Sequence, residues 1–296
     1  MKPEIIGKSK ALYSTWFFLP TYHLLFDIGD GVSANLGIHT GEINYIFLSH
    51  THKDHFLGIY NICNFAKRIS KKNKKIIKFY YYNKEKDFII KLEKSLKEMD
   101  LDKVLNFIPF EYGEKIEIES KKYIIPFSVE HSAKYYPKKI NACGFSLCEN
   151  RKMLNQEILE KINELSKEDR IKFMIDLKKS KKENEIYNYI DHKLVTYCGD
   201  SLPVELKYIE NSEIIMHECT FLTKKEVDGA HTNLEDLIKH FKKIENKKKI
   251  RKIVIYHITE KYLREQRDYK EIIEKAFKEI DIKVEVVELG KIYKTR

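Results

Sequence analysis

The sequence predicts a mixed α and β protein in which sheets pack face to face and helices lie outside them. Short apolar runs alternate with amphipathic helical stretches along most of the chain. Several of these runs end directly in a histidine or an acidic residue, as a site at one rim of a sheet sandwich requires. The 296 residues, 43% hydrophobic and 34% charged, can bury a substantial core and are typical of a soluble globular protein.

Strands are expected wherever a short apolar run is bounded by turn or basic residues. In the N-terminal half these runs are 11–19, 23–27, 43–48, 76–82, 106–110, 115–119 and 123–129. The first two flank Pro20-Thr21-Tyr22, which suits a turn, and they therefore predict a hairpin. Between the strands, residues 57–69 and 84–99 carry apolar side chains at helical spacing, which predicts two amphipathic helices.

The C-terminal half repeats this alternation after one interruption. Residues 151–191 contain neither glycine nor proline, are dense in Lys, Glu, Ile and Asn, and predict one or two charged helices. Strands are then expected at 194–198, 213–216 and 252–256, with a helix at 234–243. No internal repeat or low-complexity linker is evident. We therefore expect one domain spanning residues 1–296, with a divergent charged helical insertion at about 151–191.

Composition narrows the classes of protein to which the chain can belong. No stretch approaches the run of about 18 apolar residues that a membrane-spanning helix needs, so we expect no membrane partner. The N-terminal residues lack the apolar core of a secretory signal. The five cysteines are scattered, without a C-x-x-C pair, which argues for a reducing cytoplasm. A net charge of +10 mildly favours a polyanionic partner such as nucleic acid, although lysine is abundant throughout.

The strongest functional signal is the segment Leu48–Gly58, in which three histidines and one aspartate fall within six residues. It directly follows an apolar run, which predicts a loop at the carboxyl end of a buried strand. Imidazole and carboxylate groups suit a borderline cation such as zinc. His50 and His52 can reach one ion. Asp54 and His55 can reach a second ion beside it. The alternative is a polar surface turn that is rich in histidine.

The pattern His-x-His-x-Asp-His resembles the signature of the metallo-β-lactamase fold superfamily, and further segments strengthen the resemblance. These segments are Val129-Glu130-His131, Tyr197-Cys198-Gly199-Asp200, His217-Glu218-Cys219-Thr220-Phe221, Ala230-His231-Thr232 and His257-Ile258-Thr259-Glu260-Lys261-Tyr262. Their order and character are similar to ribonuclease Z, the endonuclease that trims transfer-RNA 3′ ends. General superfamily members share the first cluster but lack the trio of His-Glu-x-Thr-Phe, a histidine soon afterwards, and His-x-Thr-x-x-Tyr.

The resemblance implies an α+β fold, the αββα sandwich of the metallo-β-lactamase type, with a site for two Zn²⁺ ions or, alternatively, Mn²⁺. The ligands that it implies are His50, His52 and His131 for the first ion, Asp54, His55 and His257 for the second, and Asp200 as a bridge between them. Two metals in such a site clamp the attacking and leaving oxygens of a phosphodiester and lower the pKa of a bound water.

The resemblance also implies roles in catalysis. His231, oriented by Glu218, would protonate the leaving oxygen, because the pKa of histidine lies near the working pH. Asp54 would double as the base that orients the attacking water. Asp27 would support a metal-bound histidine from outside the ligand set. The alternative for His231 is an ordinary loop histidine whose neighbours cap the next helix.

Two departures from the family leave the substrate open. Ribonuclease Z carries a Gly-Pro-containing arm near 151–191 that grips the transfer-RNA elbow, and this chain lacks the Gly-Pro feature, so the arm is either remodelled or absent. The family's Gly-rich N-terminal loop, which usually ends in a basic–Asn pair, is replaced by Gly7-Lys8-Ser9-Lys10-Ala11. Tyr135-Tyr136 is a better candidate than Tyr80-Tyr81-Tyr82 for stacking on bases, because it lies just after His131.

The sequence thus favours a zinc-dependent endoribonuclease that cuts precursor transfer RNA after the discriminator and leaves a 3′-hydroxyl. One alternative is a metal-dependent cyclic-nucleotide or other small-molecule phosphodiesterase on the same fold. Another is a metal-free RNA-binding relative, which is disfavoured because every ligand position is filled. The resemblance also leaves a homodimer open, since family members commonly dimerise.

Overall fold

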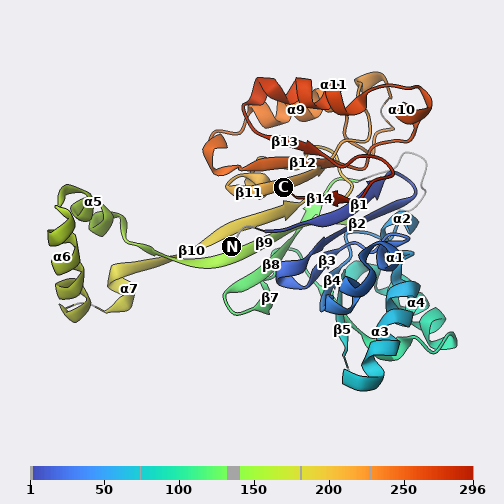
Figure 1. Cartoon of the computed structure of the whole chain (residues 1–296), viewed down its shortest axis with the longest axis horizontal. Helices are drawn as coiled ribbons and strands as arrows, with labels where there is room; N and C mark the ends of the chain where they lie inside the picture. The colour runs from blue at the N-terminus through green and yellow to red at the C-terminus, as the bar shows by residue number, and fades with distance from the viewer. Residues whose placement is uncertain (1–2, 74, 132–140, 181, 227, 296) are drawn as a thin grey trace.

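The computed structural model describes residues 3–73, 75–131, 141–180, 182–226 and 228–295. Within these residues the chain forms two seven-stranded mixed sheets that lie face to face (Figure 1). The first sheet runs in the order β14 (Tyr293–Lys294), β1 (Ile6–Lys10), β2 (Ser14–Leu19), β3 (Leu24–Phe26), β4 (Tyr45–Phe47), β5 (Ile77–Tyr82) and β6 (Leu105–Phe110). The second runs β13 (Val284–Val286), β12 (Lys252–Tyr256), β11 (Ser212–Glu218), β10 (Tyr187–Tyr197), β9 (Ala142–Leu154), β8 (Lys122–Val129) and β7 (Ile116–Glu119).

Helices cover the outer face of each sheet (Figure 1). Those beside the first sheet are α1 (Val32–Leu36), α2 (Lys53–Phe56), α3 (Ile59–Asn73) and α4 (Lys86–Glu98). Those beside the second sheet are α8 (Leu206–Ile209), α9 (Leu234–Lys242), α10 (Lys261–Arg264) and α11 (Tyr269–Phe277). One core lies under each helical layer and a third lies between the sheets. The αββα sandwich expected from the sequence is therefore confirmed.

Strand β2 shows why a continuous apolar run is needed in this architecture. Phe17 and Leu19 belong to the core between the sheets, whereas Trp16 and Phe18 belong to the core under the helices. Successive side chains of a strand point to opposite faces, so a strand covered on both sides must be apolar at every position. Strand β11 has the same division, because Ile215 packs under the helices and its neighbours pack between the sheets.

Residues 151–191 form an arm that protrudes from the sandwich (Figure 1). Its stalk is the continuation of β9 and β10 beyond the sheet, where the two strands remain paired as far as Leu154 and Tyr187. Its tip carries α5 (Gln156–Glu164), α6 (Lys167–Ser180) and α7 (Glu183–Ile186). The predicted charged helices are present, but the described part of the segment holds three of them instead of one or two, and both of its ends are strand.

Most other predicted elements are confirmed with shifts of a few residues. Strands β2 and β3 pair as the expected hairpin around Pro20–Tyr22, and α3, α4 and α9 occupy the expected amphipathic stretches. The sequence pattern did not predict the strands β1, β9, β13 and β14 or the helices α1, α2, α8, α10 and α11. All five cysteines are buried and free. Among the described residues, no helix combines the length and hydropathy needed to cross a membrane.

Candidate metal centre

The polar side chains that follow the central strands meet at one rim of the sandwich. Asp27 follows β3, His50 and His52 follow β4, His131 follows β8, Asp200 follows β10, His257 follows β12, and Glu218 ends β11. All except His52 are buried. The structure thus brings together the residues that the sequence analysis placed at a single rim, although they come from both sheets.

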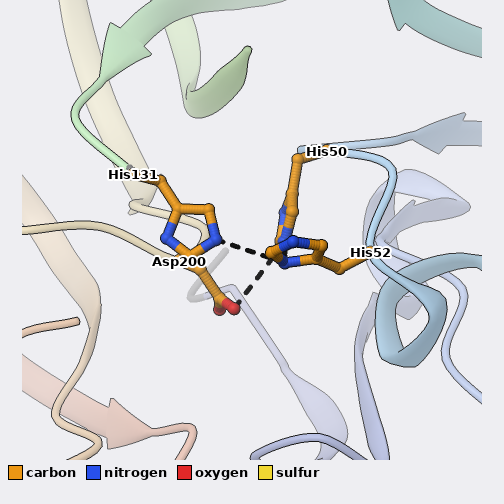
Figure 2. Close-up of side chains that lie close together, drawn as sticks. All are labelled: His50, His52, His131 and Asp200. Carbon is orange, nitrogen blue, oxygen red and sulfur yellow. Dashed lines mark hydrogen bonds and ion pairs between the residues drawn. The ribbon is translucent and has the colours of Figure 1, made fainter. Parts of the chain in front are cut away.

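The first ligand group comprises His50, His52, His131 and Asp200, as Figure 2 shows. Their potential ligand atoms all lie within 4.8 Å of one another. His52 Nδ1 lies 2.9 Å from His50 Nε2 and 3.2 Å from His131 Nε2. His50 Nε2 lies 3.7 Å from Asp200 Oδ2. Three imidazole nitrogens and one carboxylate around a common point match the donor set of a zinc ion.

The second ligand group comprises Asp54, His55, His257 and the same Asp200. Asp200 Oδ2 lies 3.2 Å from His55 Nε2 and 3.1 Å from His257 Nε2. Asp54 Oδ2 lies 3.3 Å from His257 Nε2 and 3.6 Å from His55 Nε2. Because Asp200 belongs to both groups, its carboxylate is placed to join two neighbouring cations.

The residues present fit a pair of cations on chemical grounds. Asp200 Oδ1 is buried and has no hydrogen-bond partner among the described residues. An uncompensated buried carboxylate oxygen is costly, and a cation would remove that cost. The donors are imidazoles and carboxylates, with no hydroxyl or amide between them, which is the set that zinc and manganese share. The buried His/Asp clusters are therefore consistent with a dinuclear metal site.

The electrostatics keep the histidines of the first ligand group neutral. Burial, with the neighbouring His55, holds the pKa of His50 well below its ordinary value. Burial and the neighbouring His131 lower the pKa of His52 to about 4. A neutral imidazole offers a lone pair, so both side chains are in the form that binds a metal near neutral pH.

The second ligand group instead carries a proton that a metal would replace. Burial opposes charge on His55, but Asp200, Asp54 and Asp27 raise the pKa of His55 well above its ordinary value. Burial would likewise raise the pKa of Asp54, yet His55 and His257 lower it to about 2. The carboxylates are therefore ionised, and a cation that binds His55 Nε2 displaces the proton.

Asp27 belongs to neither ligand group but orients the ligand loop through hydrogen bonds to it, as the resemblance implied. Its Oδ2 atom accepts hydrogen bonds from His55 Nδ1 at 2.7 Å and from the Tyr197 hydroxyl at 2.5 Å. Its Oδ1 atom accepts from the backbone N–H of Ser49 at 2.7 Å. With Nδ1 of His55 engaged, Nε2 is the nitrogen that faces the second ligand group, which is how outer carboxylates orient metal-binding histidines.

Glu218 and His231 form a hydrogen-bonded carboxylate–histidine pair beside the second ligand group, which we call the acid pair. His231 Nδ1 lies 2.8 Å from Glu218 Oε1, and the His231 ring stacks on His257 with centroids 5.1 Å apart. Glu218 is fully buried and also accepts the backbone N–H groups of Thr220 and Thr232. Burial opposes charge on His231, but Glu218 raises its pKa to about 9. His231 is therefore protonated at neutral pH and lies against the metal ligands.

Comparisons with known proteins agree with this geometry. No family model matches the chain. Ribonuclease Z from Pyrococcus horikoshii is 26% identical over 271 residues, which cover 86% of this chain and 80% of that protein. Ribonuclease Z from Thermococcus sibiricus is 25% identical over 292 residues, covering 91% and 88%.

Solved structures extend the similarity over almost the whole chain. The metallo-β-lactamase fold protein YhfI from Bacillus subtilis aligns with a TM-score of 0.63 at 13% identity, covering 99% of this chain and 100% of that one. Human tRNase Z, short form, aligns with a TM-score of 0.56 at 16% identity, covering 98% of each. Yeast PDE1 aligns with a TM-score of 0.61 at 12% identity, covering 98% and 99%.

The chain has the metallo-β-lactamase fold and is a distant homologue of ribonuclease Z. It is similar to ribonuclease Z over most of its length, and its buried His/Asp clusters could hold metal ions. Most of the candidate ligands follow strand ends, and the backbone is strained just after two of the strands, β3 and β12. Asp27 and His257 have φ angles of +54° and +60°, a region that residues other than glycine rarely adopt. Such strain is typical of functional sites that the surrounding structure holds in place.

Sequence reasoning missed three residues that complete this ribonuclease Z-like site. Ser49 and Tyr197 donate to Asp27, and Thr220 lies between Glu218 and His257. Each falls inside or beside a quoted motif, so proximity to a motif was the only available signal. His217 is structural, because its Nδ1 contacts the Glu218 carbonyl oxygen at 2.7 Å and faces away from the ligands. Tyr135-Tyr136 lies outside the described residues.

Proposed function

We propose that the protein is a zinc-dependent endoribonuclease that hydrolyses a phosphodiester at the 3′ end of precursor transfer RNA and leaves a 3′-hydroxyl. The observation that carries the proposal is the acid pair, Glu218–His231, placed beside the second ligand group. Cleavage of a phosphodiester releases an alkoxide that must be protonated, and a buried histidinium held by a carboxylate supplies that proton. The similarity to ribonuclease Z over most of the chain supports the same reaction.

The ligand groups supply the charge that phosphodiester hydrolysis requires. Two zinc ions bound there would neutralise the phosphate and lower the pKa of a water at the site. Asp54 stays ionised, with a pKa of about 2, because His55 and His257 outweigh the effect of burial. The backbone N–H of Leu12 also donates to its Oδ2 atom, at 3.1 Å. An ionised carboxylate fixed in this way can accept a hydrogen bond from the attacking water and orient it.

His231 acts on the leaving group, whereas Asp54 acts on the attacking water. Its Nδ1–H donates to Glu218, so the proton available for transfer is on Nε2. Giving that proton to the leaving O3′ atom converts the imidazolium to neutral imidazole. Glu218 stays in place throughout, because backbone N–H groups of Ser201, Thr220 and Thr232 hold its two carboxylate oxygens. The pair therefore works as a positioned general acid.

A small-molecule phosphodiesterase on the same fold is the second candidate. The TM-score with yeast PDE1 is no lower than that with human tRNase Z, so the fold does not separate the two reactions. Absence of an arm would have favoured a small substrate, but residues 151–191 protrude well beyond the sandwich (Figure 1). The arm leaves β10 at the end opposite to Asp200, so only a substrate much larger than a cyclic nucleotide could contact both the arm and the ligand groups, which favours the RNA.

The test is a paired assay of the zinc-loaded protein on precursor transfer RNA with a 3′ trailer and on cyclic AMP. We expect a product that ends at the discriminator with a 3′-hydroxyl, and much slower hydrolysis of cyclic AMP. Cleavage of cyclic AMP without cleavage of the RNA would replace this proposal with the second candidate. Cleavage of neither substrate would reject both.

The proposal extends to the identity of the metal, the domain organisation, the cellular compartment and the oligomeric state. We propose zinc rather than manganese because imidazoles make up most of the donor set. We also propose that residues 1–296, arm included, are a single metallo-hydrolase domain, which one cooperative unfolding transition would support. A reducing cytoplasm suits the five free cysteines. The homodimer that the family suggests is tested by the mass in solution.

A further inference from the structure

Thr220 places one hydroxyl group between the second ligand group and the acid pair. It lies two residues beyond the end of β11 and is 4% exposed. Its Oγ1 atom lies 2.8 Å from Glu218 Oε2, 3.0 Å from His257 Nδ1 and 2.9 Å from the His257 carbonyl oxygen.

The chemistry of the hydroxyl fixes the direction of these hydrogen bonds. A threonine hydroxyl has one hydrogen and can accept others through its lone pairs. The Glu218 carboxylate is a stronger acceptor than an amide carbonyl, so the hydrogen goes to Glu218. A lone pair then remains for His257 Nδ1–H. His257 Nε2, which lies 3.1 Å from Asp200 Oδ2, is thereby left with the lone pair that a cation needs.

We propose that Thr220 is a positioning residue that selects the Nδ1–H tautomer of His257 and links this ligand to Glu218. The inference rests on the proposed metal site. A chain of three groups results, in which His257 donates to Thr220 and Thr220 donates to Glu218. Glu218 in turn holds His231 through its other oxygen. One ligand of the second group, His257, is thus linked to the general acid through the Thr220 hydroxyl and Glu218.

This arrangement has a consequence for metal affinity that a packing role would not have. Thr220→Val keeps the shape of the side chain but leaves Nδ1 of His257 without its acceptor. Loss of the outer partner of a metal-binding histidine costs about tenfold to a hundredfold in affinity. The loss should fall on the second ligand group, because the first contains no ligand that contacts Thr220. Thr220→Ser retains the hydroxyl and should retain the affinity.

The test is a zinc titration of metal-free protein against a chromophoric chelator, which separates two binding steps. We expect the wild type to bind two zinc ions, and Thr220→Val to bind one normally and the other about tenfold or more weakly. Thr220→Ser should follow the wild type. Thr196→Val is the matched control, because Thr196 is also fully buried but its hydroxyl contacts Ser212 and Ser146 away from the ligands.

The outcomes separate this inference from the proposed function. If the wild type binds two ions and Thr220→Val binds them equally well, the positioning role is wrong and the metal site stands. If Thr220→Ser is as weak as Thr220→Val, the hydroxyl is not the cause and the inference also fails. A wild type that binds no zinc would overturn the proposed function together with this inference.

Discussion

The rim of the sandwich and the arm are built in opposite ways. At the rim, Asp200 and His55 are almost completely buried and belong to one connected network of charges. In the arm, Ile158 and Ile186 are the buried hydrophobic residues among those described, and α6 has none. Ligands need one fixed geometry, which burial provides, whereas an exposed arm makes its contacts outside the molecule. Changes at the rim should therefore abolish turnover, and changes in the arm should alter substrate affinity.

The largest effect is expected from Asp200→Asn at the centre of the rim. The substitution keeps the size of the side chain but removes the charge that both ligand groups share. We expect loss of at least one bound zinc and a fall in kcat/KM of at least about a thousandfold, since the metals supply several kcal/mol to the transition state. Metal analysis and single-turnover cleavage of precursor transfer RNA measure the two effects.

The control for Asp200→Asn comes from the arm. Asp191 is an aspartate on the stalk whose exposed carboxylate pairs with Lys115 at 2.6 Å. Asp191→Asn should bind two zinc ions and cleave at nearly the wild-type rate. An Asp200→Asn protein with full metal content and full activity would show that the shared carboxylate is not a ligand.

His231→Ala should have the next largest effect and should separate acid catalysis from metal binding. The imidazole belongs to neither of the two ligand groups, although with Glu218 and His257 it forms a third cluster of potential ligands. Because its Nδ1 atom is engaged with Glu218 and the seven ligands of the two groups remain, we expect the zinc content not to change. Loss of a general acid should lower kcat by about a hundredfold or more. His39→Ala is the control, because His39 is an exposed histidine whose ring pairs with Glu42 on the surface. An unchanged kcat would remove His231 from the mechanism and leave the metal site intact.

The contrast between the buried rim and the exposed arm explains which features the sequence could predict. Metal chemistry restricts a ligand to a few residue types, and a buried strand restricts the residues before it to apolar ones. His50, Asp200 and His257 each satisfy both restrictions, so they could be placed at one rim without a structure. The alternation of strands and helices indicated sheets packed face to face with helices outside, and the resemblance to the metallo-β-lactamase fold identified these layers as the αββα sandwich.

The stalk of the arm and the role of Thr220 lacked such restrictions. Arg151, Lys152 and Asp191 lie on strands that are exposed on both faces, so no alternation of polar and apolar residues marks them. Their pairing depends on a partner that is distant in the sequence. Thr220 is likewise defined by its distance to His257, which lies 37 residues further along the chain. Both features arise from tertiary contacts, which local patterns do not encode.

A smaller effect is expected when the arm is removed and the rim is left alone. Residues 155–186 can be replaced by an Asn-Gly turn, because Leu154 and Tyr187 are paired across the stalk and a two-residue hairpin can join them. We expect KM for precursor transfer RNA to rise about tenfold, the loss of roughly 1.4 kcal/mol of binding. Steady-state kinetics should show unchanged kcat and unchanged hydrolysis of bis(p-nitrophenyl) phosphate. A parallel loss on the small diester would mean that the arm supports the rim instead of the substrate.

The smallest effect is the part of the pH dependence of stability that His231 contributes. In the metal-free protein, Glu218 raises the pKa of His231 to about 9 against the opposing effect of burial. A group whose pKa is raised by folding stabilises the folded state fully below its unfolded value, about 6.5, and loses that contribution as pH rises through about 9. The melting temperature of the wild type should therefore exceed that of His231→Gln by a few degrees at pH 6, and the difference should vanish near pH 10. A difference that stays constant with pH would mean that His231 is neutral beside Glu218, and would contradict its assignment as the proton donor.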